Sequence, residues 1–355
     1  MANLDVGFSV LMSLYNKESP SSLDLCFLSL YEQTTKANEI VLVLDGFIDE
    51  KLKSIICYWE NYLPLKIVPL ESNVGLGRAL NIGLQHCSYD FIARMDTDDQ
   101  CVKDRFERQI KILSERDELS IVGSDIIEYD ENIKVEISRR VVPHNDSGIK
   151  RKAIYGNPFN HMTVMFRKDR IISAGGYVHH LFMEDYNLWL RLIASNNMME
   201  NMAIPLVKVR AGQNMLGRRR GLKYIASEWE LYLLKNKLGI NNIIFGFFIF
   251  CARAIPRLIP TFLLTYLYKL IRSKISTSVG SFLLASIVIK KYDTTTYGNF
   301  IIFQTFFLIG LNALRPITWQ AYIRFSESNK NQYTIPSLII DPFAKLDILF
   351  ILYLY

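Results

Sequence analysis

Short apolar runs alternate with helix-like segments along residues 8–95 of the chain. The runs are typical of buried strands, and we expect strands at Phe8–Tyr15 (FSVLMSLY), Glu39–Leu44 (EIVLVL), Leu65–Pro69 and Phe91–Met95. The segments between them have helical character, and we expect helices at Ser22–Gln33, Glu50–Tyr62 and Leu76–His86. This alternation predicts an α/β fold with a mainly parallel central sheet.

Polar or acidic side chains stand where three of the predicted strands end, at Tyr15, Asp45 and Asp96. The carboxyl ends of parallel strands lie at one edge of a sheet, where ligands bind. A single Asp after a strand is more often a turn former or a helix cap. Three such ends at one edge predict a shared cleft.

An acidic motif, Asp96-Thr97-Asp98-Asp99, directly follows the strand predicted at Phe91–Met95. Carboxylates at this spacing can hold a hard divalent cation and leave its other positions open for phosphate oxygens. Such a cation offsets the charge that builds on a departing diphosphate. In isolation, the motif is more typical of a solvated acidic loop.

Beyond residue 100 the pattern is less regular. We expect a strand at Ile121–Tyr129, a loop and strand at Asn157–Arg167, and an amphipathic helix at Glu184–Ala194. Additions of this kind usually build acceptor sites.

Several motifs, in order and spacing, resemble family 2 glycosyltransferases with a GT-A fold over roughly Phe8–Tyr232. They are Tyr15-Asn16-Lys17, Glu39–Gly46, Asn73-Val74-Gly75 with Arg78 and Asn81, Met95–Asp99, and Glu184-Asp185 with Trp189 and Arg191. Further motifs resemble the branch that includes amylovoran and O-antigen transferases, namely Asn157–Lys168 (NPFNHMTVMFRK), Gly175–Tyr177 (GGY) and Met215–Gly221 (MLGRRRG).

The resemblance implies inverting transfer of a hexose or N-acetylhexosamine from a nucleotide-diphosphate sugar, expected to be a UDP-sugar. It implies that Tyr15 stacks on the uracil and that Asp45 bonds its edge. The other donor-binding residues that it implies are Asn73, Arg78, Asp96 and His161. For Tyr15 the alternative is strand-end packing, for Arg78 a surface charge, and for His161 a structural role.

The resemblance also implies a metal site and a catalytic pair. Asp98, with Asp96, would hold Mn²⁺ or Mg²⁺. Asp185, beside Glu184, would be the base that removes the proton of the acceptor hydroxyl as it attacks. Two acids at a helix N-terminus are also common as partners of the helix dipole.

The acceptor implied by the resemblance is an oligosaccharide on undecaprenyl diphosphate, in the synthesis of a bacterial surface polysaccharide. The Gln-x-x-Arg-Trp motif of processive synthases is missing, which indicates single additions. We expect the enzyme at the cytoplasmic face of the inner membrane, with no nucleic-acid partner.

The chain divides by composition into a catalytic domain at 1–238, a basic amphipathic segment at 239–274 and an apolar tail at 275–355. Between Lys208 and Lys274 there are thirteen Lys or Arg and two acids, Glu228 and Glu230, which predicts an anionic surface as the partner. We expect 239–274 to lie in the membrane interface, the alternative being a helix packed on the domain. In the tail, Phe300–Leu314 is a marginal membrane-spanning candidate.

Other classes fit less well. A dinucleotide-dependent oxidoreductase needs a glycine-rich turn after its first strand, and Asn16–Pro20 has none. A second rival is a flippase-like export component, faintly suggested by Tyr297-Gly298 in the tail. The five cysteines are scattered, which indicates neither a disulfide framework nor a zinc site. Met1–Asp5 lacks the features of a secretory signal, so we expect the catalytic part to stay inside the cell.

Overall fold

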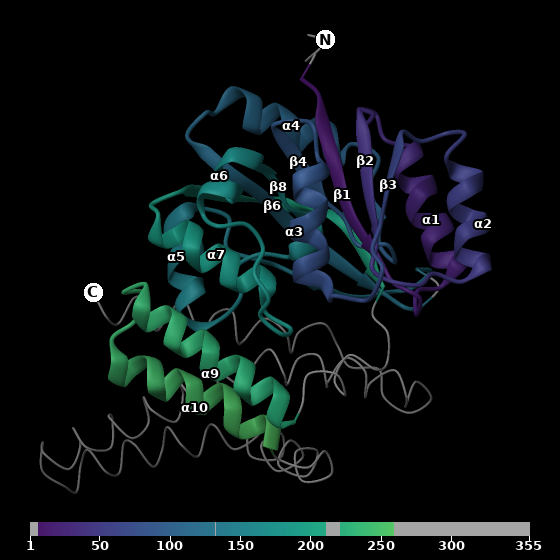
Figure 1. Ribbon diagram of the computed structural model, residues 1–355. Helices are drawn as coiled ribbons and strands as arrows, with labels where there is room; N and C mark the ends of the chain where they lie inside the picture. The colour runs from purple at the N-terminus through teal and green to yellow at the C-terminus, as the bar shows by residue number, and fades with distance from the viewer. Residues whose placement is uncertain (1–5, 132, 211–220, 259–355) are drawn as a thin grey trace, which may run out of the picture. The chain divides into compact units, whose positions relative to one another are not determined.

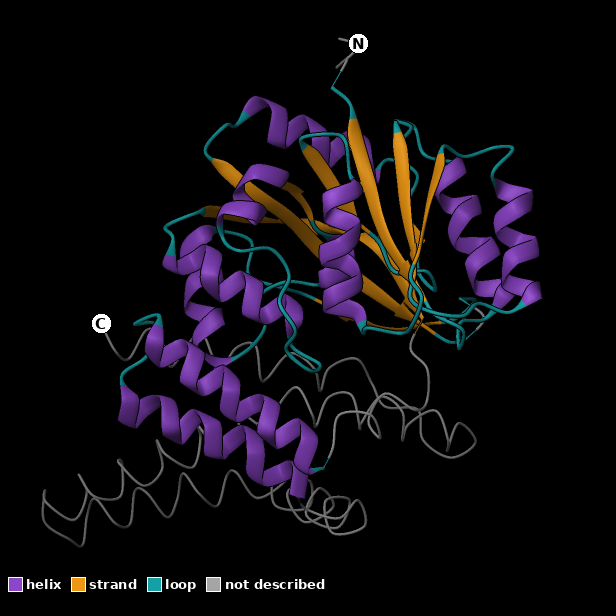
Figure 2. Cartoon of the chain, in the orientation of Figure 1, coloured by secondary structure: helices purple, strands orange, loops and turns teal. Residues whose placement is uncertain are grey.

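A computed structural model describes residues 6–131, 133–210 and 221–258, whose centre is a nine-stranded sheet with helices on both faces (Figures 1 and 2). The strands are β1 Phe8–Leu14, β2 Glu39–Leu44, β3 Leu65–Pro69, β4 Phe91–Arg94, β5 Gln100–Cys101, β6 Leu119–Tyr129, β7 Glu136–Arg140, β8 Met165–Arg167 and β9 Met198–Arg210. The helices are α1 Pro20–Tyr31, α2 Glu50–Trp59, α3 Leu76–His86, α4 Arg105–Glu115, α5 Asp146–Tyr155, α6 Lys168–Ser173, α7 Glu184–Ala194, α9 Leu222–Lys237 and α10 Ile243–Leu258, with a short 3₁₀ helix at His161–Thr163.

The strand order is β3-β2-β1-β4-β8-β6-β9-β5, and β7 pairs with β6. β1 pairs in parallel with β2 and β4, and β2 with β3, as the alternating pattern predicts. The expectation of a mainly parallel sheet is wrong for the second half, where β8 is antiparallel to both β4 and β6. The chain reverses direction between β6 and β7, which form an antiparallel pair, and β8 runs in the direction of β7, so it is also antiparallel to β6. The sheet is therefore mixed.

Two apolar layers form because side chains alternate across each strand. On one face Met12 of β1 packs in a cluster with residues of α1, α2 and α4, including Phe27 and Phe106. On the other face Leu11 packs with residues of α3, α5, α6 and α7, including Leu84 and Trp189. The layers fix the sheet edge at which β1, β2 and β4 end.

Helices α9 and α10 lie side by side (Figure 1). α9 packs Tyr224 and Leu231 into a third cluster with Tyr186 and Leu190 of α7. This contact joins α9 to α7, the helix that begins with Glu184. The positions of α9 and α10 can therefore affect the position of Glu184.

The basic side chains of α10 face inward. Glu228 of α9 is 2% exposed and pairs at 2.7 Å with both Arg253 and Arg257. Helix α10 is continuous over Ile243–Leu258, and Glu228 pairs with the two arginines that interrupt its apolar sequence. The expectation that these arginines face an anionic partner is wrong for this pair.

Several predictions lie outside the described residues: residues 259–274 of the expected interface segment, the tail at 275–355 with its spanning candidate, and the Tyr297-Gly298 resemblance. Within the described part of the chain, no helix has the length and apolar character needed to cross a bilayer. The domain boundary at residue 238 stays a prediction.

Candidate active site

Asp45, at the end of β2, organises the loop between β3 and α3. Its carboxylate accepts hydrogen bonds from the backbone N–H groups of Val74 (2.7 Å) and Gly75 (3.1 Å). The Asn73 side chain donates to the Asp45 carbonyl at 3.2 Å. A Cβ atom at Gly46 would lie 2.7 Å from the Asn73 nitrogen, and the φ of Gly46 is +88°, so only glycine suits this turn. The fold thus brings Asp45 and Asn73 together, while their contacts with a donor stay predictions.

Tyr15 follows β1, the strand beside β2, and is 36% exposed. The Asp45 N–H donates to the Leu14 carbonyl at 2.7 Å, which keeps the two strand ends together. Arg78, in the first turn of α3, is exposed. The sheet therefore places the ends of β1 and β2 as the sequence predicts, while the donor contacts of Tyr15 and Arg78 stay predictions.

The acidic motif after β4 gathers three carboxylates. Asp96, Asp98 and Asp99 each offer an oxygen, and these atoms all lie within 4.8 Å of one another. Asp99 is 2% exposed and accepts a hydrogen bond from the Arg210 N–H at 3.1 Å. Oxygen donors of this kind suit hard divalent cations, so the cluster fits Mn²⁺ or Mg²⁺ chemically.

Burial and the neighbouring negative charges make Asp98 and Asp99 hard to ionise. Burial, then the charges of Asp96 and Glu18, raise the pKa of Asp98 to about 7. Burial and the neighbouring Asp98 and Asp96 raise the pKa of Asp99 well above its usual range. A bound divalent cation would reverse this repulsion and favour the ionised forms.

Arg94 is a functional candidate that the sequence analysis missed. It is 1% exposed, and its Nη1 lies 2.5 Å from Asp96 Oδ1. Its Nε is buried without a hydrogen-bond partner. The available signal was an arginine inside the otherwise apolar strand Phe91–Arg94, which is costly unless a charge partner is present.

The acid pair lies at the start of α7. Asp185 Oδ2 accepts a 2.5 Å hydrogen bond from Asn157 Nδ2, which fixes the direction of the carboxylate. The N-cap of α7 is Met183, so the two acids belong to its first turn. Burial and the charge of Asp185 raise the pKa of Glu184 to about 7. Burial also raises the pKa of Asp185, and a raised pKa favours a carboxylate as proton acceptor near neutral pH.

His161 is buried against Tyr177 and Trp189. Its Nε2 lies 2.9 Å from the Tyr177 hydroxyl, and its ring packs edge-on against Trp189. Burial, and to a lesser extent the charge of Arg94, lower its pKa well below the usual range, which keeps the imidazole neutral. Its part in donor binding stays a prediction.

Glycine at position 77 lets α3 approach the acid pair. A Cβ atom there would lie 2.9 Å from Glu184 Cβ and 3.0 Å from the Val178 carbonyl oxygen. Helix α3 begins directly after the loop that Asp45 binds. Its close contact with Glu184 therefore links the residues expected to bind the donor to the acid pair. The charge of Asp96 also contributes to the raised pKa of Glu184, so the two acidic groups sense each other.

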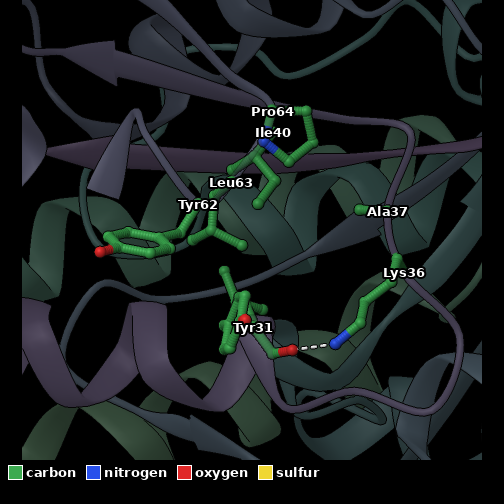
Figure 3. A pocket seen from close by; sticks show the side chains of 8 residues that line it. Tyr31, Lys36, Ala37, Ile40, Tyr62, Leu63 and Pro64 are labelled. Carbon is green, nitrogen blue, oxygen red and sulfur yellow. Dashed lines mark hydrogen bonds between the residues drawn. The ribbon is translucent and has the colours of Figure 1, made fainter. Parts of the chain in front are cut away.

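A separate hollow of about 140 Å³ contains no carboxylate among its lining side chains (Figure 3). It is formed by the end of α1 and the loops that lead into β2 and β3, and Lys36 Nζ there donates to the Tyr31 carbonyl. Its lining residues are Leu30, Tyr31, Lys36, Ala37, Ile40, Tyr62, Leu63 and Pro64. It lies at the amino ends of those strands, opposite to Asp45.

The sequence is similar to that of known glycosyltransferases. Residues 9–176 match the profile named Glycosyl transferase family 2. The chain is 50% identical over 262 residues to the amylovoran biosynthesis glycosyltransferase AmsE of Erwinia amylovora, a match that covers 74% of this chain and 98% of that protein. The chain belongs to glycosyl transferase family 2.

A second relative of this glycosyltransferase is the UDP-Gal:alpha-D-GlcNAc-diphosphoundecaprenol beta-1,3-galactosyltransferase of Escherichia coli. The two are 34% identical over 265 residues, covering 74% of this chain and 95% of that protein. Among solved structures, S. aureus TarS 1–349 in complex with UDP-GlcNAc matches with a TM-score of 0.54 and 17% identity, covering 69% of this chain and 71% of that one. This likeness confirms the GT-A-like fold.

We expect Gly77→Ala to lower turnover of this glycosyltransferase roughly tenfold, because the added methyl group displaces the first turn of α7. Overpacking of this kind costs about 1 to 3 kcal/mol of stability. Steady-state kinetics and thermal unfolding would measure the two effects.

Gly83→Ala is the matched control on the same helix. Its Cβ would lie 2.5 Å from Leu11 Cδ1 in the core and not against the acids. It should lose stability but keep the turnover of the folded protein. Equal turnover in the two variants would contradict a close contact of α3 with the acid pair.

Proposed function

We propose that this glycosyltransferase adds single sugar residues, with inversion, from a UDP-sugar to a lipid-linked oligosaccharide in bacterial surface polysaccharide synthesis. The observation that carries the proposal is the presence of two distinct, partly buried acidic groups, one after β4 and one at the start of α7. The names of the relatives supply the chemistry: amylovoran biosynthesis for one, and a UDP-Gal donor with a diphosphoundecaprenol acceptor for the other.

The donor is proposed to bind along the ends of β1, β2 and β4. Tyr15 is exposed enough to stack on the uracil, and Asp45 is held rigidly by two backbone N–H groups. The remaining proposed donor contacts are Asn73, Arg78, Asp96 and His161. Donor binding would use groups that the fold has already positioned, which reduces the entropy lost on binding.

The diphosphate leaving group is proposed to be stabilised at the acidic cluster. Asp98 and Asp96 would hold Mn²⁺ or Mg²⁺, which supplies positive charge for the departing diphosphate. Arg94 keeps Asp96 in place through its 2.5 Å ion pair. Asp99 takes its orientation from the backbone of Arg210.

Asp185 is proposed as the base, with Glu184 beside it. Inversion requires a proton acceptor on the face of the sugar opposite the leaving group. Asp185 Oδ1 accepts from the Tyr186 N–H and Oδ2 from Asn157, so the carboxylate is oriented from both sides. As the acceptor hydroxyl attacks, its proton would pass to Asp185. Glu184 would add a second negative charge beside this proton acceptor.

The outer side of α10 supports action at the inner-membrane surface. Its exposed side chains are apolar, with Ile244 69%, Phe248 51% and Ile255 56% exposed. Its arginines pair with Glu228 instead. A helix that faces water carries its charged side chains outward, whereas α10 carries apolar side chains outward. An exposed apolar face of this kind suits the bilayer interface. The flippase-like alternative rests on residues outside the described part of the chain, and the family match gives it no support.

We expect transfer to require a divalent cation and to be abolished by excess chelator. Cation affinity should fall as the pH falls, because protons compete for Asp98, whose pKa is about 7. Between one unit above and one unit below that value, Mn²⁺ affinity should drop by roughly tenfold. Calorimetric titration of Mn²⁺, and assays with a panel of nucleotide sugars and a synthetic lipid diphosphate acceptor, would check this. Full transfer in excess chelator, or an Mn²⁺ affinity that does not change with pH, would refute the proposed metal site.

We expect Phe248→Glu to weaken binding of the full-length chain to phosphatidylethanolamine–phosphatidylglycerol vesicles, because it places a charge on the apolar side of α10. Leu28→Glu, at an exposed apolar position of α1, is the control and should bind like the wild type. Vesicle sedimentation measures both variants. Undiminished binding of Phe248→Glu would show that this face of α10 does not contact lipid.

A further inference from the structure

The C-terminal end of α5 is capped by three other helices. Each of its last three carbonyl oxygens accepts a hydrogen bond from a different one. The pairs are the Tyr186 hydroxyl of α7 with Ala153 O at 2.6 Å, Lys235 Nζ of α9 with Ile154 O at 2.8 Å, and Arg253 Nη1 of α10 with Tyr155 O at 2.8 Å. Carbonyls at a helix C-terminus lack intrahelical partners, and cationic donors suit that end of the dipole.

Lys235 is the centre of this cap. It is 3% exposed, and its Nζ also donates to the Tyr186 hydroxyl at 2.8 Å. The same hydroxyl donates to Ala153, so one amino group fixes both the end of α5 and the first turn of α7. A lysine is rarely buried so deeply, and its placement here is costly unless these contacts have a role.

The capped end leads directly to the group that orients Asp185. Asn157 is two residues beyond the end of α5, and its Oδ1 accepts from the Phe159 N–H at 3.2 Å. With its amide turned this way, Nδ2 donates to Asp185 Oδ2. The other partner of this bond, Asp185, immediately precedes Tyr186. Lys235 therefore contacts the polypeptide on both sides of the Asn157–Asp185 hydrogen bond.

The hairpin of α9 and α10 is itself held by charge pairs. Glu228 of α9 binds Arg253 and Arg257 of α10, and this fixes the guanidinium that caps Tyr155. The α9 backbone also receives a contact from the loop before α7, since His180 Nε2 lies 2.9 Å from the Ser227 carbonyl oxygen. The hairpin thus contacts the segments on either side of the acid pair, at the end of α5 and in the loop before α7.

We propose that Lys235 is a positioning residue for Asp185, through which the α9–α10 hairpin sets the geometry of the Asn157–Asp185 hydrogen bond. The proposal rests on the assignment of Asp185 as the base. Lys235 acts on the chemical step, and it leaves the binding of UDP at the ends of β1, β2 and β4 unchanged. A misplaced base lowers kcat because the acceptor proton is no longer within reach.

Lys235→Met tests this in the full-length chain in detergent, because methionine keeps an apolar stem and removes the donors. We expect kcat to fall by roughly ten- to a hundredfold with unchanged affinity for UDP. Tyr186→Phe, which keeps the ring and removes only the hydroxyl, should lower kcat in the same direction. Lys237→Met, at an exposed lysine of the same helix, is the control and should retain wild-type kcat.

A double-mutant cycle with Asn157→Ala separates positioning from a merely structural role. If Lys235 acts through Asn157, the double variant should be no slower than Asn157→Ala alone. Independent, multiplicative losses would overturn the proposal. If Lys235→Met does not fold, as judged by circular dichroism, the same cycle with Tyr186→Phe decides.

Asp185→Asn, measured in parallel, separates a failure of the base assignment from a failure of the positioning role of Lys235. Normal turnover in Asp185→Asn would remove the base assignment, and the positioning proposal with it. Lost turnover in Asp185→Asn together with wild-type kcat in both Lys235→Met and Tyr186→Phe would overturn the positioning proposal alone. Lost turnover in all three, with UDP affinity retained, is the expected result.

Discussion

The guanidinium of Arg94 is the interaction on which the acidic edge of the sheet depends. Six carboxylates gathered there without a cation would repel one another and resist ionisation; they belong to Glu18, Asp96, Asp98, Asp99, Glu184 and Asp185. Burial raises the pKa of both Asp98 and Glu184, and the charge of Arg94 opposes that rise in each. Because Arg94 is buried in β4, its position is fixed by the core itself.

The two acidic groups are supported by different parts of the fold. The cluster after β4 is held by Arg94 and by the backbone of Arg210 at the end of β9. The pair on α7 is held by Asn157 and by the close approach of α3 at Gly77. Separate supports allow one group to stabilise a leaving group while the other accepts a proton, because each can be positioned without moving the other.

Local patterns were sufficient for the first half of the fold. The expected segments Leu65–Pro69 and Leu76–His86 match β3 and α3 as predicted, since apolar periodicity depends on neighbours in sequence. The three-residue strand β8 is too short to show its direction, which is set by insertion between β4 and β6. The role of Asn157 left no clear local pattern, because Asn157 meets Asp185 across 28 positions of chain. The inward orientation of the Arg253 side chain likewise left no local pattern, because its partner Glu228 lies on another helix.

The acids after β4 and those on α7 are proposed to have different chemical roles, and Asp98→Asn and Asp185→Asn, measured side by side, test this difference. Turnover and cation-dependent affinity for UDP are the two quantities to compare. Asp185→Asn should lose turnover by on the order of a hundredfold or more and bind UDP normally, whereas Asp98→Asn should bind UDP weakly in the presence of Mn²⁺. Near-normal turnover in Asp185→Asn, or a product that retains the anomeric configuration of the donor, would contradict the account.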